Sequence, residues 1–250
     1  MTGFEEKLTL LDHFRELRKR LIRSVLAVIV TIIISFFFWK WIFYILTYPT
    51  HGISLYYFEM TEMFGTTMKV CLGAGLILAM PYITYQAIMF IRPALTDREK
   101  RYLYIVMPWV AVMFLGGVVF GYFILVPPAV RFLLTWGSDV AVPYISVSNY
   151  ISVVTRLLLV IGLVFELPVV STFLARIGIV KPEWLASKRK IFVVIAFVVA
   201  AIITPTFDPV NQSLVAIPLI ILYEMSIWLA KLVYRRKREA LVEVEAPSGG

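Results

Sequence analysis

One carboxylate of this 250-residue chain stands inside a long apolar run. Glu166 lies in the stretch 162–168, GLVFELP, with apolar residues on both sides. A charged group at the centre of a membrane-spanning helix costs about 2.5–3.5 kcal/mol on insertion scales, so such a residue is by default a candidate site for a proton, a substrate or a partner. The alternative is a glutamic acid that hydrogen-bonds another helix of the same bundle.

A second carboxylate, Glu16, belongs to an amphipathic N-terminal segment. Apolar residues recur there at helical spacing and charged residues occupy the other faces, which is typical of a helix that lies at a membrane surface. Glu16 and Arg20 are four residues apart, so on a helix they are able to pair for a few tenths of a kcal/mol. An ion pair between Glu16 and Arg20 on a solvated helix face is therefore an equal alternative to a ligand-binding role of Glu16. The apolar positions are Leu10, Phe14, Leu17 and Leu21.

A third carboxylate, Glu99, lies in a basic segment between two apolar runs. Thr96 and Glu99 match a capping box that would begin the next helix, and this role alone explains the acid. The segment also places Glu99 on the same predicted membrane face as Glu16, among many bases. Two such acids are able to accept a ligand with two adjacent guanidinium groups, because arginine–carboxylate pairs are bidentate and directional.

The other reactive residue types are sparse. Cys71 is the only cysteine, and His13 and His51 lie far apart without metal-ligand spacing. The sequence contains neither a P-loop nor a His-Glu-x-x-His motif. We therefore expect no catalytic residue, no metal and no cofactor, and we expect the protein not to be an enzyme.

These carboxylates must be positioned by elements that cross a membrane. Hydrophobic residues make up 60% of the chain and charged residues 16%, whereas a soluble domain carries about 25% charged residues. Continuous apolar runs of roughly 20 residues predict spanning helices. We predict one all-α domain over 1–235 with six transmembrane helices and an N-terminal amphipathic interfacial helix, followed by a disordered tail over 236–250. The spans are predicted near 21–46, 66–91, 102–127, 149–178, 191–204 and 212–233.

The fifth predicted span is short. As a helix it would measure only about 21 Å, and Pro218 interrupts the sixth span. Two such spans would thin the membrane locally or need a partner to cover them. Pro81, Pro108 and Pro168 fall inside earlier spans, and an interior proline removes a hydrogen-bond donor and bends a helix. We therefore expect kinked helices in a concave bundle.

The distribution of basic residues predicts the orientation. All but four of the 24 Lys and Arg residues lie in the segments that six spans would place on one side. Because cytoplasmic loops are enriched in Lys and Arg, both termini are predicted to be cytoplasmic. The net charge of +8 is thus a sign of topology and does not indicate nucleic-acid binding. The four exceptions are Lys40, Lys69, Arg131 and Arg156.

Several short phrases of the sequence, in order and in register, resemble the TatC family, the polytopic receptor subunit of the twin-arginine protein translocase. The resemblance covers about 8–235 and leaves only the acidic tail outside. The phrases are HFRELRKRL at 13–21, MPYITYQ at 80–86, FIRPAL at 90–95 with EKR at 99–101, FELP at 165–168, and AIP at 216–218 followed by YE at 223–224.

The resemblance implies a receptor in the prokaryotic inner membrane, embedded in lipid and self-associating in a larger complex. It would bind the twin-arginine signal peptides of folded proteins and recruit single-span TatA- and TatB-type subunits, with the proton gradient as the energy source. Glu16 and Glu99 match the family's acids that receive the two arginines, and Arg18 and Arg20 belong to the same N-terminal motif.

The resemblance also implies roles deeper in the membrane. Glu166 matches the family's intramembrane acid, which is linked to the single-span partners. Thr204 and Gln212 match the region that contacts those partners, at the outer ends of the two short spans. Pro49 matches a family position in the first outer loop. The chain departs from many relatives at Asp208, where they place the acid closer to the preceding proline.

Two other classes of function compete with the receptor. A proton- or cation-coupled secondary transporter would use Glu166 as its ion site, but the two halves of the chain show no internal repeat. An intramembrane enzyme would need a histidine within a span, and neither His13 nor His51 lies in one.

Overall fold

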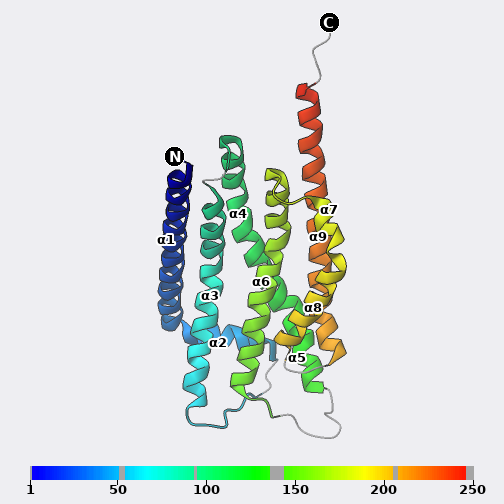
Figure 1. The fold of residues 1–250 in the computed structure, drawn as a ribbon. Helices are drawn as coiled ribbons and strands as arrows, with labels where there is room; N and C mark the ends of the chain where they lie inside the picture. Colours follow the sequence, from blue (N-terminus) through cyan, green and yellow to red (C-terminus); the bar gives the residue numbers. More distant parts are fainter. Residues whose placement is uncertain (1, 51–53, 93–94, 136–143, 205–207, 246–250) are drawn as a thin grey trace.

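The computed structural model describes residues 2–50, 54–92, 95–135, 144–204 and 208–245. Helices make up most of these residues, and an isolated bridge pairs Tyr56 with Ser146. The helices, shown in Figure 1, are α1 (Thr2–Phe37), α2 (Trp39–Thr47), η1 (Tyr48–Thr50), α3 (Glu62–Ile91), α4 (Asp97–Phe120), the π-helix η3 (Gly121–Leu125), α5 (Val126–Thr135), α6 (Val147–Ile177), α7 (Pro182–Ser187), α8 (Arg189–Ile203) and α9 (Pro209–Glu245).

The described residues contain five helices that are long and apolar enough to cross a membrane, so the chain is a multi-pass, all-helical membrane protein. Helix α8 has 15 residues and lies where the short fifth span was predicted. At 1.5 Å per residue it is about 22 Å long, less than the ~30 Å of a hydrocarbon core. The five longer stretches are Phe14–Phe37, Glu62–Ile91, Glu99–Phe132, Val147–Ile177 and Pro209–Arg235.

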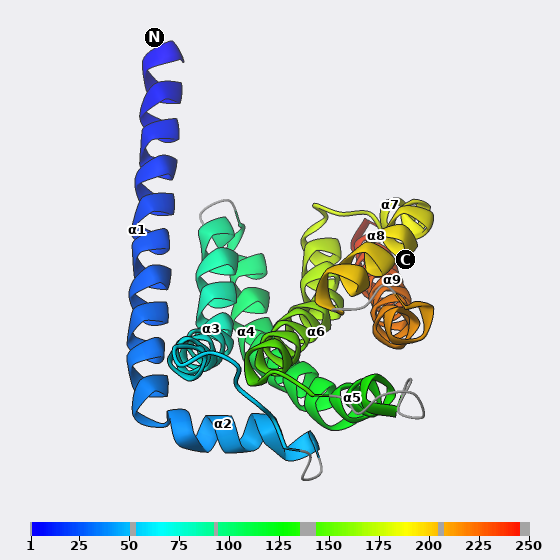
Figure 2. The same ribbon diagram turned by 90° about the horizontal axis from the view of Figure 1, so that it is seen from below.

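Helix α6 is the centre of the bundle. It packs against α3 and α4 on one side and against α9 on the other, while α1 packs on α3 and α8 on α9. Figure 2 shows α1 and the α8–α9 pair at opposite sides of the molecule. Ile151 and Ile161 of α6 are fully buried in this core. Both termini lie at one end of the bundle, here called the terminal end, and the opposite end is called the distal end (Figure 1).

The first apolar run is divided in the structure. Helix α1 ends at Phe37 and α2 turns across the distal end (Figure 2), so the span predicted over 21–46 ends about nine residues early. Neither proline nor glycine marks the break, and Phe38 adopts φ −105° and ψ 12°. The break precedes Trp39, Lys40 and Trp41, and tryptophan is enriched at membrane interfaces. A run of apolar residues therefore does not by itself reveal where the chain leaves the membrane.

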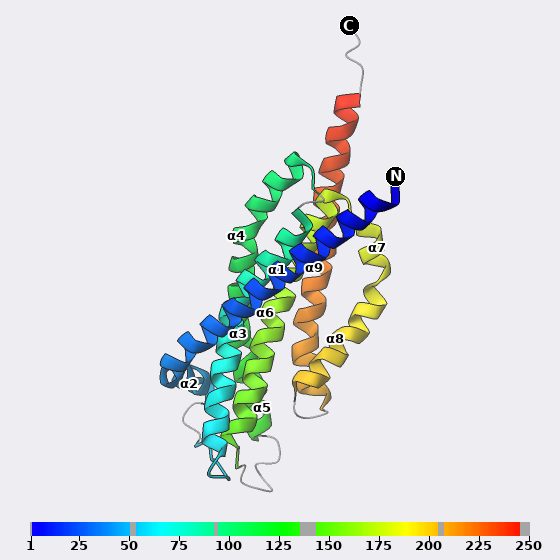
Figure 3. The same ribbon diagram turned by 60° about the vertical axis from the view of Figure 1, so that its left-hand side comes forward.

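The terminal segments differ from expectation in a similar way. The amphipathic N-terminal residues are continuous with the first span in a single helix α1 (Figure 3), whereas a separate interfacial helix was predicted. At the other terminus α9 continues to Glu245, although a disordered tail was predicted over 236–250. No proline or glycine occurs over 4–37 or 219–245, so nothing in these stretches ends a helix.

The prolines Pro49, Pro81 and Pro168 occupy two kinds of position. Pro49 is buried in η1, directly after α2. Pro81 lies inside α3, and Pro168 lies buried inside α6. Since a proline lacks an N–H group, each interior proline leaves one carbonyl of the preceding turn without its helical donor.

A carboxylate joins the starts of two helices at the distal end of the bundle. Glu62, at the start of α3, accepts a hydrogen bond from the hydroxyl of Ser146, which precedes α6. It also accepts hydrogen bonds from the backbone N–H of Phe58 at 2.7 Å and of Ser148 at 3.3 Å. The first turns of α3 and α6 are thus joined through one side chain.

Candidate functional site

The Glu16 carboxylate is held by an arginine one turn later on α1. Nε of Arg20 donates to Oε1 of Glu16 at 3.1 Å, and Nη2 donates to the same oxygen. The third nitrogen, Nη1, donates to Oε1 of Gln86 on α3 at 3.3 Å. The pairing of Glu16 with Arg20 predicted from their spacing is therefore confirmed, but it is not a solvated surface pair, because it continues onto a second helix.

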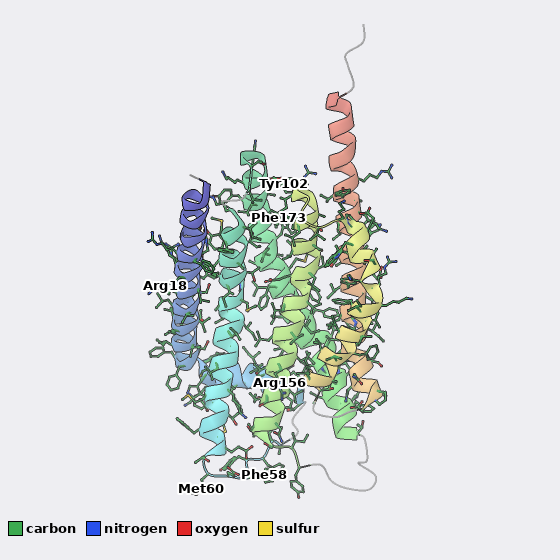
Figure 4. The ribbon with its side chains drawn as sticks, in the orientation of Figure 1. Arg18, Phe58, Met60, Tyr102, Arg156 and Phe173 are labelled. Carbon is green, nitrogen blue, oxygen red and sulfur yellow. The ribbon has the colours of Figure 1, made fainter. Side chains whose placement is uncertain are left out.

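One oxygen of Glu16 is left open by this arrangement. Both Arg20 bonds go to Oε1, and no described residue donates to Oε2. The Glu16 side chain is 32% exposed, whereas that of Arg20 is 15% exposed. Glu16 thus offers Oε2 as an acceptor at the surface, while Arg20, itself bonded to Gln86, holds the other oxygen. Arg18, on the same helix, is exposed (Figure 4).

Glu99 is held at the first turn of α4. Its Oε2 accepts hydrogen bonds from the backbone N–H of Thr96 at 2.9 Å and from the Thr96 hydroxyl at 2.8 Å. The capping box predicted from the sequence is confirmed. Glu99 therefore has a structural role, and its side chain is half-buried at the terminal end of the bundle.

Glu16 and Glu99 come from separate helices, α1 and α4, and α3 packs against both. Each carboxylate is held by a residue one turn away in the sequence: Arg20 holds Glu16, and Thr96 holds Glu99. The structure thus holds each of these two carboxylates by hydrogen bonds, in the half of its helix that lies toward the terminal end (Figure 1).

Glu166 lies in the interior of the bundle, 5% exposed. The hydroxyl of Thr84 on α3 lies 2.8 Å from its Oε2 and 3.0 Å from its Oε1. A hydroxyl has one proton, so it donates to one of these oxygens at a time. The alternative considered from the sequence, a bond to another helix of the same bundle, is what the structure shows; the role toward partners stays a prediction.

Thr204 and Gln212 lie where α8 meets α9, near the distal end. The buried Thr204 hydroxyl donates to the carbonyl of Ala200 at 2.9 Å. Nε2 of Gln212 donates to the carbonyl of Phe197 at 2.9 Å and so links α9 to α8. Both predicted partner-contact residues are therefore used inside the chain as well.

Asp208 begins α9. Its Oδ1 accepts a hydrogen bond from the backbone N–H of Asn211 at 2.7 Å, and Pro209 is the first helical residue. An aspartate at this position satisfies one of the free amides of the first turn, and proline is favoured just after it. The role of Asp208, which the sequence left open, is thus that of a helix cap.

The described residues contain no group of three His, Cys, Asp or Glu side chains that could hold a metal ion. Glu16, Glu99 and Glu166 each have a hydrogen-bonded support instead. A carboxylate that is held in this way suits the binding of cationic side chains.

A known family model matches most of the chain. Residues 12–218 match the family model described as TatC, Sec-independent protein translocase protein. The chain belongs to the TatC family. As a TatC-family protein it functions in Sec-independent protein translocation, and it is a transport protein and not an enzyme.

Relatives of this TatC-family chain include bacterial and plant proteins. The Sec-independent protein translocase protein TatC of Aquifex aeolicus is 44% identical over 236 residues, which cover 92% of this chain and 98% of that protein. The chloroplastic TATC of Arabidopsis thaliana is 36% identical, with 92% and 68% of the two chains covered. A crystal structure titled as the twin arginine translocase receptor TatC superposes with a TM-score of 0.81 at 43% identity, covering 88% of this chain and 99% of that one.

Two polar residues of this TatC-family site were not selected from the sequence as site residues. Gln86 and Thr84 both lie in α3, inside the phrase that carried the resemblance, and each bonds an ionisable residue of another helix. A polar side chain in an otherwise apolar span has to find a hydrogen-bond partner, and this is the signal that marks both. Their partners, Arg20 and Glu166, are 66 and 82 residues away and are not readable from the sequence.

Proposed function

We propose that this TatC-family protein is a receptor that binds the paired arginines of twin-arginine signal peptides at the terminal end of the bundle. The observation that carries the proposal is the Oε2 atom of Glu16: Arg20 bonds only Oε1, and no side chain that the structure describes donates to Oε2. Glu99 supplies the second carboxylate at the same end. The solved twin arginine translocase receptor TatC, which is 43% identical to this chain, supports this interpretation.

The chemistry of the two acids favours arginine over lysine. A guanidinium presents five N–H donors in a planar fork, whereas an ammonium is a compact point charge without a preferred plane. A carboxylate that is already fixed on one oxygen offers the other in a defined direction. Glu16 and Glu99 are expected to take one arginine each, while Arg18 and Arg20 support the N-terminal part of the site.

We infer that the terminal end is cytoplasmic and that α8 is the sixth crossing. Both termini lie at the same end (Figure 1), which requires an even number of crossings, and the five long helices supply an odd number. Helix α8 runs from the terminal toward the distal end and packs against α9. The basic residues flanking the spans favour a cytoplasmic terminal end in a prokaryotic inner membrane.

The short α8 is the part of the bundle that we expect single-span partners of the TatA and TatB type to cover. Val194, Val198 and Ile202 of α8 are exposed, and the helix is shorter than the bilayer it would cross. Thr204 and Gln212 at its distal end and Glu166 within α6 are the polar groups proposed to face these partners. Export driven by the proton gradient, after these partners are recruited, and self-association in a larger complex belong to the same proposal.

The proposal is tested by binding of a twin-arginine signal peptide and of its Lys-Lys counterpart to the full chain in nanodiscs. We expect the Arg-Arg peptide to bind more tightly, and Glu16→Ala and Glu99→Ala each to remove the preference. Glu183→Ala is a matched control, because Glu183 is an exposed acid at the same end, on α7. Equal binding of the two peptides by the wild-type chain would contradict the proposal and return both acids to purely structural roles.

A further inference from the structure

Gln86 supports the charged pair on α1 from a neighbouring helix. Its side chain is 4% exposed within α3, and its Oε1 accepts a hydrogen bond from Nη1 of Arg20 at 3.3 Å. An amide buried in an apolar span must be hydrogen-bonded. Here the bond is made to a cation that itself holds Glu16, so the amide is joined to the proposed recognition site.

A second hydrogen bond sets the orientation of this amide. Nε2 of Gln86 donates to the hydroxyl of Tyr82, one turn earlier on α3, at 2.7 Å. With the nitrogen engaged there, the amide presents its oxygen toward Arg20. The ring of Tyr82 stacks on Tyr85 with 5.9 Å between centroids, which limits its movement.

The guanidinium of Arg20 transmits this orientation to Glu16. Its fork is planar, so fixing Nη1 on Gln86 and both Nε and Nη2 on Glu16 fixes the plane of the whole group. Both bonds to Glu16 end on Oε1, and Oε2 accepts none from the described residues. Without Gln86, the pair would be an ordinary surface pair between flexible side chains, whose geometry is poorly defined.

We propose that Gln86 is a positioning residue for arginine recognition: through Arg20 it holds Glu16 so that Oε2 faces an incoming guanidinium. The inference rests on the proposed role of Glu16 as an acceptor of a signal-peptide arginine. Gln86 itself need not contact the peptide. It determines how well the site distinguishes a directional guanidinium from a lysine ammonium, which has no preferred plane.

The test is a titration of the full chain in nanodiscs with the Arg-Arg and Lys-Lys peptides. Gln86→Leu removes the acceptor at similar side-chain size and is expected to weaken Arg-Arg binding by roughly threefold to tenfold, the range of one net hydrogen bond, with little change for Lys-Lys. Arg20→Lys keeps the charge but loses the fork, and it is expected to lose the preference as well. Tyr82→Phe removes only the acceptor that orients the Gln86 amide, so it should weaken Arg-Arg binding less than Gln86→Leu does. If Gln86→Leu does not fold, Tyr82→Phe replaces it: a weaker Arg-Arg affinity supports the inference and an unchanged one overturns it.

The matched control is Tyr85→Phe. Tyr85 lies beside Tyr82 on α3, and its hydroxyl makes no hydrogen bond with the described residues, so its removal should leave both affinities unchanged. Melting temperatures of all variants in the same nanodiscs separate a loss of fold from a loss of recognition.

A double-mutant cycle separates positioning from general structural support. If Gln86 acts through Glu16, Gln86→Leu should have no further effect on peptide binding once Glu16→Gln is present. If the losses of peptide affinity in the two single variants add up in the double variant, the inference is overturned. It is also overturned if Gln86→Leu prefers the Arg-Arg peptide over the Lys-Lys peptide as strongly as the wild-type chain does. Tighter Arg-Arg binding by Gln86→Leu would overturn it too, because Arg20 would then compete for Glu16 and not support it. A wild-type chain without preference would instead refute the proposed function itself.

Discussion

The hydroxyl of Thr84 on α3 lies 2.8 Å from the carboxylate of Glu166 on α6, in the buried interior of the bundle. This bond joins two helices that are far apart in the sequence and gives an acid inside the membrane its hydrogen-bond donor. A buried carboxyl group without such a partner is costly in lipid.

Removing the Thr84 hydroxyl should therefore destabilise the chain. We expect Thr84→Val to lower the free energy of unfolding by about 1 kcal/mol, the size of interhelical hydrogen bonds in membranes. Thermal unfolding in detergent measures the change. Thr84→Ser keeps the hydroxyl and should stay close to wild type; a loss of equal size in both variants would mean that packing, and not the hydrogen bond, is responsible.

The close approach of α1 to α3 at Gly75 gives a second prediction. A Cβ atom at Gly75 would lie 2.7 Å from Cα and 2.8 Å from N of Ile32, so the backbone of α1 would have to move. The Thr31 hydroxyl also donates to the Gly75 carbonyl at 2.7 Å. We expect Gly75→Ala to cost about 1–3 kcal/mol of stability, as overpacking does.

The control for this prediction is Gly116→Ala on α4. A Cβ atom there meets no atom within 4 Å, so the substitution should be neutral or slightly stabilising through helix propensity. Melting temperatures of the two variants compare them directly. Equal melting temperatures would show that the α1–α3 contact tolerates a wider separation.

The distal end should loosen when Glu62 is lost. Its carboxylate accepts hydrogen bonds from the N–H groups of Phe58 and Ser148 and from the Ser146 hydroxyl. Since hydrogen bonds to the charged form favour ionisation, these donors hold the Glu62 carboxylate in its acceptor state. Glu62→Ala should speed amide hydrogen exchange at Phe58 and Ser148, measured by mass spectrometry.

Glu59→Ala is the matched change for this experiment. Glu59 is an exposed acid three residues earlier, and its side chain makes no hydrogen bond with the described residues. Its removal should leave exchange at Phe58 and Ser148 as in wild type. Slow exchange preserved in Glu62→Ala would show that the backbone bridge between Tyr56 and Ser146 alone holds the two helix starts together.

Gln212 should matter to the isolated chain and not only to partner binding. Its Nε2 donates to the Phe197 carbonyl and ties α9 to α8. Gln212→Leu removes one hydrogen bond and should therefore lower the free energy of unfolding by about 1 kcal/mol. We expect this loss to appear as a lower melting temperature in nanodiscs that contain no other protein. Val210→Ala, at an exposed site in the same turn, serves as control. An unchanged melting temperature would leave partner contact as the role of Gln212.

Local patterns were readable from the sequence because their members are neighbours in the chain. The Thr96–Glu99 capping box and the Glu16–Arg20 pair each lie within one helical turn, and both are present in the structure. The depth of Glu166 within an apolar run and the phrases shared with the TatC family likewise depend only on residue order. These features were sufficient to predict an all-helical, multi-pass membrane protein of this family.

Tertiary structure alone decided which distant groups meet. Three hydrogen bonds between helices depend on how the helices rotate and pack, and residue order does not encode this rotation directly. They join Arg20 to Gln86, Glu166 to Thr84, and Gln212 of α9 to Phe197 of α8. The turn between α1 and α2 was hidden for a related reason: inside lipid an apolar run is compatible with one straight helix or two, and the packing of α2 across the distal end selects the second.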